Sequence, residues 1–305
     1  MSVILLGYHN MGCRALKVLK ELDIFVPAVF THKDNPKENI WFDSLAKLSE
    51  EFGIPVYYPE NINEDKWVKL LKELKPDILL SCYFRDMIKS HILEIPKIAA
   101  VNLHGSLLPK YRGRCPVNWQ LVHGETESGV TLHHMVEKAD AGDIIAQKKV
   151  KIDFDDTATT LFRKLEDAAE ELLRTYIPKL LDGTAPRLKQ DHSKASYFGG
   201  RRPEDGKIDF SKDATSIYNL IRAVTWPYPG AFCKLNDKKL YIWKAMPVED
   251  LTLSSIPGQV IIKDRDVFIQ TGKGMLKIIS ASFEHMPKGE NYIPKELYSQ
   301  NIILK

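Results

Sequence analysis

The sequence predicts an α/β protein of two domains, a parallel sheet covered by helices followed by a smaller β-rich domain. Short apolar runs alternate with amphipathic segments through the first third of the 305 residues, and this pattern is typical of a parallel sheet covered on both faces. From about residue 206 the pattern changes to short strand-like runs separated by tight turns, which indicates a small barrel or sandwich. The stretch between them, residues 193–208 (SKASYFGGRRPEDGKI), is polar, glycine-rich and basic, and we place the domain joint there.

The N-terminal elements follow from the spacing of the apolar residues. Continuous apolar runs predict strands within residues 2–8, 24–32, 76–84 and 97–105. Helical spacing predicts helices within residues 13–22, 44–53, 66–75 and 157–183. The last of these helices has Thr157 as its expected N-cap, and Gly183 follows its end.

The C-terminal elements are predicted by turn residues. Residues 232–248 contain two strand runs around an Asn-Asp turn, and residues 257–284 contain three more, separated by Asp-Arg-Asp and Gly-Lys-Gly. We therefore expect a first domain over residues 1–190, a linker over 191–205 and a second domain over 206–305.

Composition excludes several classes of protein. Lys and Arg total 43 against 40 Asp and Glu, a net charge of +3, which is too balanced to indicate polyanion binding. No run reaches the roughly 18 apolar residues of a membrane helix, and the N-terminus lacks the features of a signal peptide, so we expect a cytoplasmic protein. The four cysteines (Cys13, Cys82, Cys115, Cys233) form no CxxC pair, so neither a zinc site nor a disulfide framework is expected.

The first turn has the position of a dinucleotide-binding fingerprint but not its residues. Gly7–Gly12 (GYHNMG) lies between the first expected strand and helix. It lacks the central glycine of GxGxxG, and no acidic residue is well placed on the second strand. We expect a Rossmann-like turn without a nicotinamide site.

Two polar residues end the last apolar run of the first half. Asn102 and His104 lie two apart in VNLHGS, so on a strand their side chains share a face. Open parallel sheets bind ligands beyond the carboxyl ends of their strands, and residues 81–88 (SCYFRDMI) leave a strand at the same edge. The adjacent His133 and His134 face opposite ways on a strand, so we interpret both as structural.

Residues 101–147 (VNLHGSLLPKYRGRCPVNWQLVHGETESGVTLHHMVEKADAGDIIAQ) carry a resemblance to a known family. The strings Asn-x-His-x-Ser-Leu-Leu-Pro, Arg-Gly, Gly-x-Thr-x-Ser-Gly-Val-Thr and Asp-x-Gly resemble the signature of the folate-dependent formyltransferases. Within that family they are most similar to the formyltransferase domain of the bifunctional polymyxin-resistance (ArnA) group. The similarity includes GYHNMG, FTHKDNP and GIPVYYPENIN before this stretch, and FGGRRPEDG and RAVTWPYPGAF after it.

The resemblance implies a site, a fold and a co-substrate. It assigns catalysis to Asn102, His104 and Asp140, and it implies an OB-like β-barrel for the C-terminal domain. The co-substrate would be N10-formyltetrahydrofolate, with no metal. Its contacts would be the backbone of Asp86, Met87 and Ile88, the side chain of Arg114, and the loop formed by Val136, Glu137, Lys138, Ala139 and Asp140.

These residue types suit the chemistry. Formyl transfer to an amine passes through a tetrahedral oxyanion, which needs preorganised donors and a group that moves protons. The Asn102 amide can donate to that oxygen. His104 can polarise the formyl oxygen when charged or accept a proton when neutral, and Asp140 would favour the charged ring. A structural salt bridge is the alternative role of Arg114.

Two acceptors fit the resemblance, a nucleotide-linked amino-sugar and methionyl-tRNA. The tRNA enzymes carry a long basic loop after the second strand, where this chain has residues 31–44 (THKDNPKENIWFDS), short and mixed in charge. Their motif tends to read Trp-Arg-Gly-Ala-Ala-Pro, where this chain reads Tyr-Arg-Gly-Arg-Cys-Pro. We therefore expect a UDP- or dTDP-linked amino-sugar such as UDP-4-amino-4-deoxy-L-arabinose, with methionyl-tRNA as the alternative. We expect no nucleic-acid partner and no membrane insertion, and assembly into a homo-oligomer stays open.

Arg201 and Arg202 are candidates for acceptor binding. A guanidinium makes bidentate contacts with phosphate oxygens, so either side chain could reach a sugar-nucleotide diphosphate. A salt bridge with Glu204, Asp205 or Asp209 is the equally weighted alternative.

Overall fold

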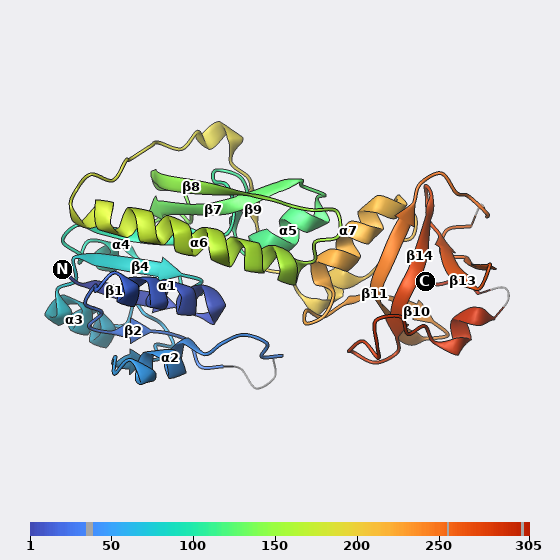
Figure 1. Cartoon of the computed structure of the whole chain (residues 1–305), viewed down its shortest axis with the longest axis horizontal. Coiled ribbons are helices and arrows are strands. Elements are labelled where there is room, and N and C mark those ends of the chain that lie inside the picture. The colour runs from blue at the N-terminus through green and yellow to red at the C-terminus, as the bar shows by residue number, and fades with distance from the viewer. Residues whose placement is uncertain (35–38, 255, 300–301) are drawn as a thin grey trace. The chain divides into compact units, whose positions relative to one another are not determined.

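The computed structural model describes residues 1–34, 39–254, 256–299 and 302–305. Its N-terminal part contains a seven-stranded sheet with the order β3-β2-β1-β4-β5-β7-β8 (Figure 1). The five parallel strands are β1 (Val3–Gly7), β2 (Val29–Phe30), β3 (Val56–Tyr57), β4 (Ile78–Cys82) and β5 (Ala99–His104). The antiparallel pair β7 (Glu127–His134) and β8 (Ile144–Lys151) extends the sheet beyond β5. The fold class predicted for this part, a parallel Rossmann-like sheet, is confirmed.

The register of the central strands brings three loops to one edge of the sheet. Gly7 of β1 lies opposite Cys82 of β4, and Cys82 lies opposite Leu103 of β5. Parallel strands put their carboxyl ends at the same edge, so the loops that follow β1, β4 and β5 begin there. β1 and β4 are buried along their whole length, as their continuous apolar sequences predict.

Helices alternate with the strands along this part of the chain. They are α1 (His9–Glu21), α2 (Leu45–Glu51), α3 (Asp65–Leu74), α4 (Ser90–Leu93), α5 (Pro116–Val122) and α6 (Ala158–Leu181). Of these, α1, α2, α3 and α6 have the apolar spacing that the sequence shows. The expected N-cap of α6 is confirmed, because the Thr157 hydroxyl accepts a hydrogen bond from the Thr160 N–H at 3.3 Å. Side chains join α6 to α1, where Arg14 donates to Glu170 at 2.6 Å.

The C-terminal part contains an antiparallel five-stranded sheet with the order β10-β11-β14-β13-β12. These strands are Ala231–Leu235, Lys238–Val248, Met275–Ser282, Asp266–Gln270 and Val260–Lys263. The Asn236-Asp237 and Asp264-Arg265 turns have positive φ at both residues, as two-residue hairpins require. The predicted β-rich character of this part is confirmed. Helix α7 (Ala214–Val224) precedes the sheet, and Asp213 caps it by accepting from the Ser216 N–H at 2.8 Å.

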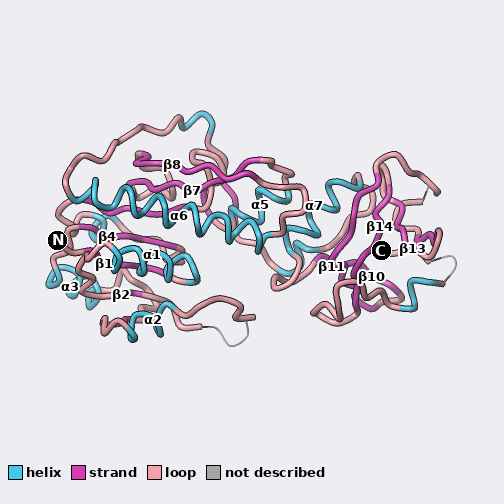
Figure 2. Tube along the Cα trace, viewed as in Figure 1, coloured by secondary structure: helices cyan, strands magenta, loops and turns pink. Residues whose placement is uncertain are grey.

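Short elements occur between α6 and α7, in a segment that Figure 2 shows to be mostly loop. β9 (Tyr197–Phe198) pairs in parallel with β6 (Arg112–Gly113). Short 3-10 helices cover His192–Lys194 and Pro203–Gly206, and another, Lys295–Tyr298, lies near the C-terminus.

The described chain separates into two compact units. The first contains residues 1–116, 127–151 and 162–199, and the second contains 117–126, 152–161 and 200–305. Two segments from within the expected first domain, residues 117–126 and 152–161, therefore belong to the second unit, and the domain limits at 190 and 206 stay a prediction. Among the described residues, no helix is both long enough and apolar enough to span a membrane.

Candidate active site

Asn102 and His104 lie on β5 with side chains on one face, as predicted. β5 pairs with the antiparallel β7 so that Asn102 lies opposite His133 and His104 lies opposite Thr131. Directly opposed side chains share a face of the sheet. The pairing therefore adds His133 and Thr131 to the face that carries the two predicted residues.

Asp140 is the point at which these side chains meet. Its Oδ1 lies 3.4 Å from Asn102 Nδ2, 3.7 Å from His104 Nδ1 and 3.5 Å from His133 Nε2. Its Oδ2 accepts the Gly113 N–H at 2.8 Å. The three residues predicted from the resemblance thus lie within one cluster, and the side chains of His133, His104 and Asp140 are only 1%, 7% and 12% exposed.

The charge of Asp140 is stabilised by its neighbours. Burial alone would raise the pKa of this carboxyl, but the neighbouring His104 and the Gly113 N–H act against burial, and the pKa lies below its usual range. An ionised carboxylate beside two imidazole rings can stabilise an imidazolium that forms during a reaction.

The side chain of Gln190 holds the loop that carries Asp140 in place. Its Nε2 donates to the Asp140 carbonyl at 2.8 Å and to the Gly142 carbonyl at 2.5 Å. Its Oε1 accepts from Nη2 of Arg112, a side chain that is 1% exposed. The Asp-x-Gly spacing has a steric reason, because a Cβ at Gly142 would lie 1.9 Å from the His134 carbonyl oxygen.

Gly113 places a backbone donor against Asp140. Its φ is +94°, and a Cβ at this position would lie 2.3 Å from the Phe198 carbonyl oxygen of β9. Only glycine combines this φ with so close a backbone approach. The Arg-Gly of the motif therefore has a physical role in the cluster.

The hydrogen bonds of His104 indicate which of its nitrogens is available. Nε2 lies 2.7 Å from the Tyr111 carbonyl oxygen, and a carbonyl only accepts, so Nε2 carries the hydrogen. In the neutral ring, Nδ1 then has the lone pair, and Nδ1 faces Asp140. A proton taken by His104 would arrive at Nδ1 and lie against the carboxylate.

The predicted folate contacts follow β4, β5 and β7. Asp86, Met87 and Ile88 come after β4, where Met87 is 57% exposed and Ile88 is buried. The Met87 carbonyl accepts from the Asn63 side chain at 2.9 Å, so this backbone is already oriented. Arg114 is exposed, and its N–H donates to the Phe198 carbonyl at 2.9 Å.

The loop between β7 and Asp140 contains the remaining predicted contacts. Val136 is 43% exposed, and Glu137, Lys138 and Ala139 are exposed or half-buried. The Lys138 ammonium lies 5.1 Å from the centre of the Tyr197 ring, within the range of a cation–π contact.

The two arginines predicted to bind the acceptor make local contacts. Arg201 Nη2 donates to the Asp205 carbonyl at 3.0 Å, and its guanidinium lies 4.5 Å from the centre of the Trp119 ring. Arg202 is exposed, and its backbone N–H donates to the Asp205 carboxylate at 2.6 Å.

Sequence reasoning missed His133, Gln190 and Arg112 as parts of the cluster. The alternation of side chains required one of His133 and His134 to face Asn102 if β7 pairs with β5, but the sequence does not reveal that pairing or its register. Gln190 and Arg112 offered no signal, because their roles depend on contacts between residues 78 apart in the chain.

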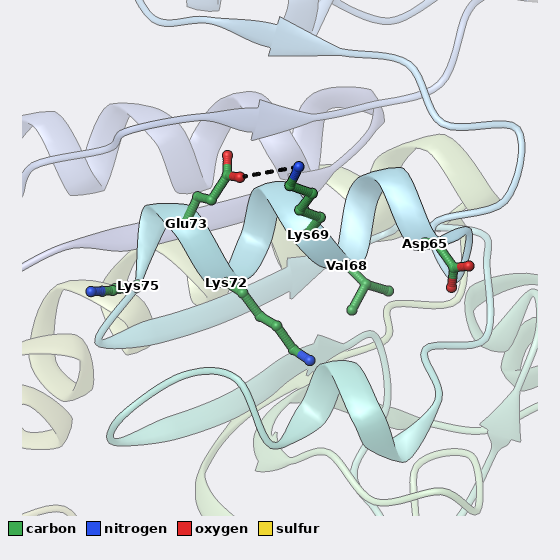
Figure 3. Close-up of a pocket in the computed structure, with 6 residues that line it drawn as sticks. All are labelled: Asp65, Val68, Lys69, Lys72, Glu73 and Lys75. Carbon is green, nitrogen blue, oxygen red and sulfur yellow. Dashed lines mark ion pairs between the residues drawn. The ribbon is translucent and has the colours of Figure 1, made fainter.

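A hollow on the surface lies apart from these residues. Figure 3 shows it along α3, where Lys69 and Glu73 form an ion pair at 4.0 Å. The residues that line it are Asp65, Val68, Lys69, Lys72, Glu73 and Lys75. Among the residues that the structure describes, no group of three or more His, Cys, Asp or Glu side chains has the arrangement of a metal site.

Comparison with solved structures finds proteins of similar architecture. An N-formyltransferase from Helicobacter canadensis, in complex with folinic acid and dTDP-3-aminofucose, is 25% identical, with a TM-score of 0.71 over 90% of this chain and 97% of that chain. WlaRD, a sugar 3N-formyl transferase, is 24% identical, with a TM-score of 0.69 over 91% and 96% of the two chains. HypX from Aquifex aeolicus, in complex with tetrahydrofolic acid, is 20% identical, with a TM-score of 0.63 over 92% of this chain and 43% of that chain.

Family models cover most of the sequence. The formyl transferase model matches residues 8–177, which include Asn102, His104, His133 and Asp140. The model of the formyl transferase C-terminal domain matches residues 201–290, which include the antiparallel sheet up to the end of β14. The chain therefore belongs to the formyl transferase family.

Proposed function

We propose that this enzyme transfers the formyl group of N10-formyltetrahydrofolate to the amine of a nucleotide-linked amino-sugar. The observation that carries the proposal is the convergence of Asn102 and His104 on one oxygen of the Asp140 carboxylate, a side chain that is 12% exposed. These are the residue types that formyl transfer needs, and Asn102 and His104 lie at the carboxyl end of β5, where open α/β sheets bind ligands.

Each of the three residues has a step in the proposed reaction. The neutral acceptor amine attacks the formyl carbon, and Asn102 Nδ2 donates a hydrogen bond to the oxyanion that forms. The proton lost by the amine moves to His104 Nδ1, and Asp140 stabilises the resulting imidazolium. The same proton then passes to N10 as the bond between N10 and the formyl carbon breaks, which releases tetrahydrofolate and the N-formyl sugar.

The donor would bind along the strand ends that flank this cluster. We assign the pterin to the backbone of Asp86, Met87 and Ile88 and to the loop over residues 136–140, because exposed main chain suits its amide-like edge. Arg114 is exposed and would pair with the glutamate carboxylates of the folate. The folinic acid and tetrahydrofolic acid in the Helicobacter and HypX complexes support a folate donor for this chain.

The acceptor class is supported by the Helicobacter protein, whose complex contains dTDP-3-aminofucose. HypX is also similar in fold. The fold alone therefore does not determine which acceptor the enzyme uses. The short loop over residues 31–44 also favours the sugar, although its residues 35–38 lie outside the described part of the chain. Similarity to the ArnA strings makes UDP-4-amino-4-deoxy-L-arabinose the first acceptor to test.

A panel of acceptors tests the proposal. N10-formyltetrahydrofolate is offered with UDP- and dTDP-linked amino-sugars and with methionyl-tRNA, and formylated products are measured by mass spectrometry. We expect transfer to at least one amino-sugar and none to the tRNA.

The dependence on salt provides a second criterion. A nucleotide-sugar presents one diphosphate, so its KM should change by less than about threefold between roughly 50 and 200 mM salt, whereas a tRNA held by several phosphates would lose affinity steeply. Efficient formylation of methionyl-tRNA without transfer to any sugar would replace the proposed acceptor and leave the catalytic assignment in place.

A further inference from the structure

His133 lies at the centre of the polar cluster, although the resemblance gives it no role. Its side chain is 1% exposed and lies opposite Asn102 in the ladder between β5 and β7. Its Nε2 is 3.2 Å from Asn102 Nδ2 and 3.5 Å from Asp140 Oδ1. A buried imidazole between an amide and a carboxylate must match the donors and acceptors around it.

The surrounding atoms select one tautomer of His133. Nδ1 lies 2.8 Å from the His134 carbonyl oxygen, which only accepts, so Nδ1 carries a hydrogen. The nearer neighbour of Nε2 is the Asn102 amide nitrogen, which only donates. In a charged ring, the Nε2–H would face the Asn102 Nδ2–H at 3.2 Å, and two donors cannot bond to each other. In the neutral ring, Nε2 has a lone pair that can accept the Asn102 hydrogen.

The orientation of the Asn102 amide follows from the same neighbours. Nδ2 also lies 3.4 Å from Asp140 Oδ1, and an ionised carboxylate only accepts. A flipped amide would turn its oxygen toward the carboxylate oxygen and toward the lone pair of His133. The two acceptors therefore hold Nδ2 on their side.

We propose that His133 is a positioning residue that orients the Asn102 amide for catalysis. Neutral His133 accepts one Nδ2 hydrogen at the shorter distance and fixes the plane of the amide. The second hydrogen has only the longer contact with Asp140 and is the one that moves to the formyl oxygen when the donor binds. This inference rests on the oxyanion role proposed for Asn102.

Protonation of His133 would remove its acceptor. The titratable groups around it are Asp140, His104 across the same carboxylate, and the adjacent His134 on the other face of β7 with its neighbour Asp143. A protonated Nε2 could not accept the Nδ2 hydrogen of Asn102, so the role proposed for His133 belongs to the neutral ring.

Three substitutions separate an acceptor role from a packing role. His133→Gln can place an amide oxygen near the position of Nε2, whereas His133→Asn can keep a donor near Nδ1 but does not reach Asn102. His133→Leu keeps neither. We expect His133→Gln to keep kcat within about threefold and the other two to lose roughly tenfold to a hundredfold, with the donor KM unchanged.

The matched control is His134→Gln, on the same strand and the opposite face, which should change kcat by less than about twofold. Thermal melting checks that each variant folds. If His133→Leu does not fold, the comparison of kcat between His133→Gln and His133→Asn decides the test. Normal activity in His133→Asn with a loss in His133→Gln would overturn the proposal, because the bond to the His134 carbonyl would then be the role of the ring. Unchanged kcat in all three variants would overturn it as well.

A measurement without an acceptor separates this proposal from the proposed function. In the ¹⁵N spectrum of histidine-labelled protein, His133 should show the neutral ring with hydrogen on Nδ1 at mildly alkaline pH. A charged ring or the opposite tautomer would overturn the proposal. If the acceptor panel fails while this spectrum has the expected form, the acceptor assignment is wrong and the orientation of Asn102 stands.

Discussion

The cluster around Asp140 and the segment over residues 198–205 (FGGRRPED) both contain charged side chains. The two regions differ in the partners that these side chains contact. In the cluster, side chains from residues 102 to 140 meet with little exposure to solvent. In the segment, Arg201 and Arg202 bond to Asp205, only three or four residues away.

The two arrangements differ in the free energy that it costs to form them. Burial of an ionised carboxylate among polar groups is unfavourable unless specific partners compensate it. Side chains near the surface that bond to near neighbours carry little such penalty. The cluster therefore depends on the whole fold, and its disturbance should affect catalysis far more than a change in the segment over residues 198–205.

The largest effect is expected for Asp140→Asn. The amide keeps the size of the carboxylate but loses the charge that would stabilise an imidazolium at His104, 3.7 Å away. We expect kcat to fall by roughly a hundredfold or more while the donor KM stays within about threefold. Steady-state kinetics with the best sugar acceptor measure both.

Asp143→Asn is the matched control for this substitution. Asp143 lies three residues further on, is 26% exposed and pairs with Arg187 at 2.8 Å, so its loss should leave kcat nearly unchanged.

Asn102→Ala and His104→Ala should lower kcat as much as Asp140→Asn does. The double variant His104→Ala with Asp140→Asn should be little worse than either alone, because the residues act as a unit. More than half of normal activity in Asp140→Asn would remove the carboxylate from the mechanism.

The same variant has an expected dependence on pH. The pKa of Asp140 is below its usual range in the folded protein, so its stabilising contribution is complete above the unfolded value of about 4 and is lost as pH falls below that value. The difference in unfolding free energy between wild type and Asp140→Asn should therefore shrink from about pH 6 to pH 3. A constant difference in urea unfolding would contradict this assignment.

A smaller but still large effect is expected for Gly113→Ala. A Cβ would meet the Phe198 carbonyl oxygen at 2.3 Å, so β6 must move and the N–H that reaches Asp140 moves with it. We expect a loss of roughly tenfold or more in kcat, since small displacements of positioned groups are costly. The cost in unfolding free energy should exceed about 2 kcal/mol.

Gly183→Ala controls for the backbone conformation. Gly183 has a φ of +78°, and a Cβ at this residue would have no neighbouring atom within 4 Å. The substitution therefore brings only the strain of positive φ, about 1 to 2 kcal/mol. Its kcat should be normal. Equal activity losses in the two variants would mean that strain, rather than the position of the Gly113 N–H, affects catalysis.

Local signals predicted the elements that depend on sequence neighbours. The Asn236-Asp237 turn and the Thr157 cap were predicted because their hydrogen bonds and φ values involve adjacent residues. Helix α7 was not predicted. Ile217, Leu220, Ile221 and Val224 have the spacing of a helix face and Asp213 caps the helix, so a local signal was present. The polar Asn219 and Arg222 between them are buried and bond to each other at 2.9 Å.

The candidate site divides in the same way. Asn102, His104 and Asp140 were assigned because their motif is similar to that of a known family. His133 was not, because its position depends on the register between β5 and β7, which brings together residues 31 apart. A shift of one residue would place His134 on that face instead, and no local property of the sequence distinguishes the two.

The smallest effect is expected in the segment over residues 198–205, where the two arginines can be separated. Arg202→Gln keeps the backbone N–H that donates to Asp205 and removes the guanidinium. If that group binds the acceptor diphosphate, the acceptor KM should rise roughly threefold to tenfold with the donor KM and the melting temperature unchanged. Arg201→Gln instead removes contacts with the Asp205 carbonyl and the Trp119 ring, and should cost about 1 kcal/mol of stability.

Inhibition by the free nucleotide identifies the atoms involved. Because a guanidinium recognises phosphate oxygens, Arg202→Gln should weaken inhibition by UDP or dTDP and leave the weaker inhibition by the corresponding nucleoside unchanged. Equal effects on nucleotide and nucleoside would indicate a contact with the base or ribose. An unchanged acceptor KM in Arg202→Gln would leave the segment with a structural role only, in which the Asp205 contacts hold its backbone.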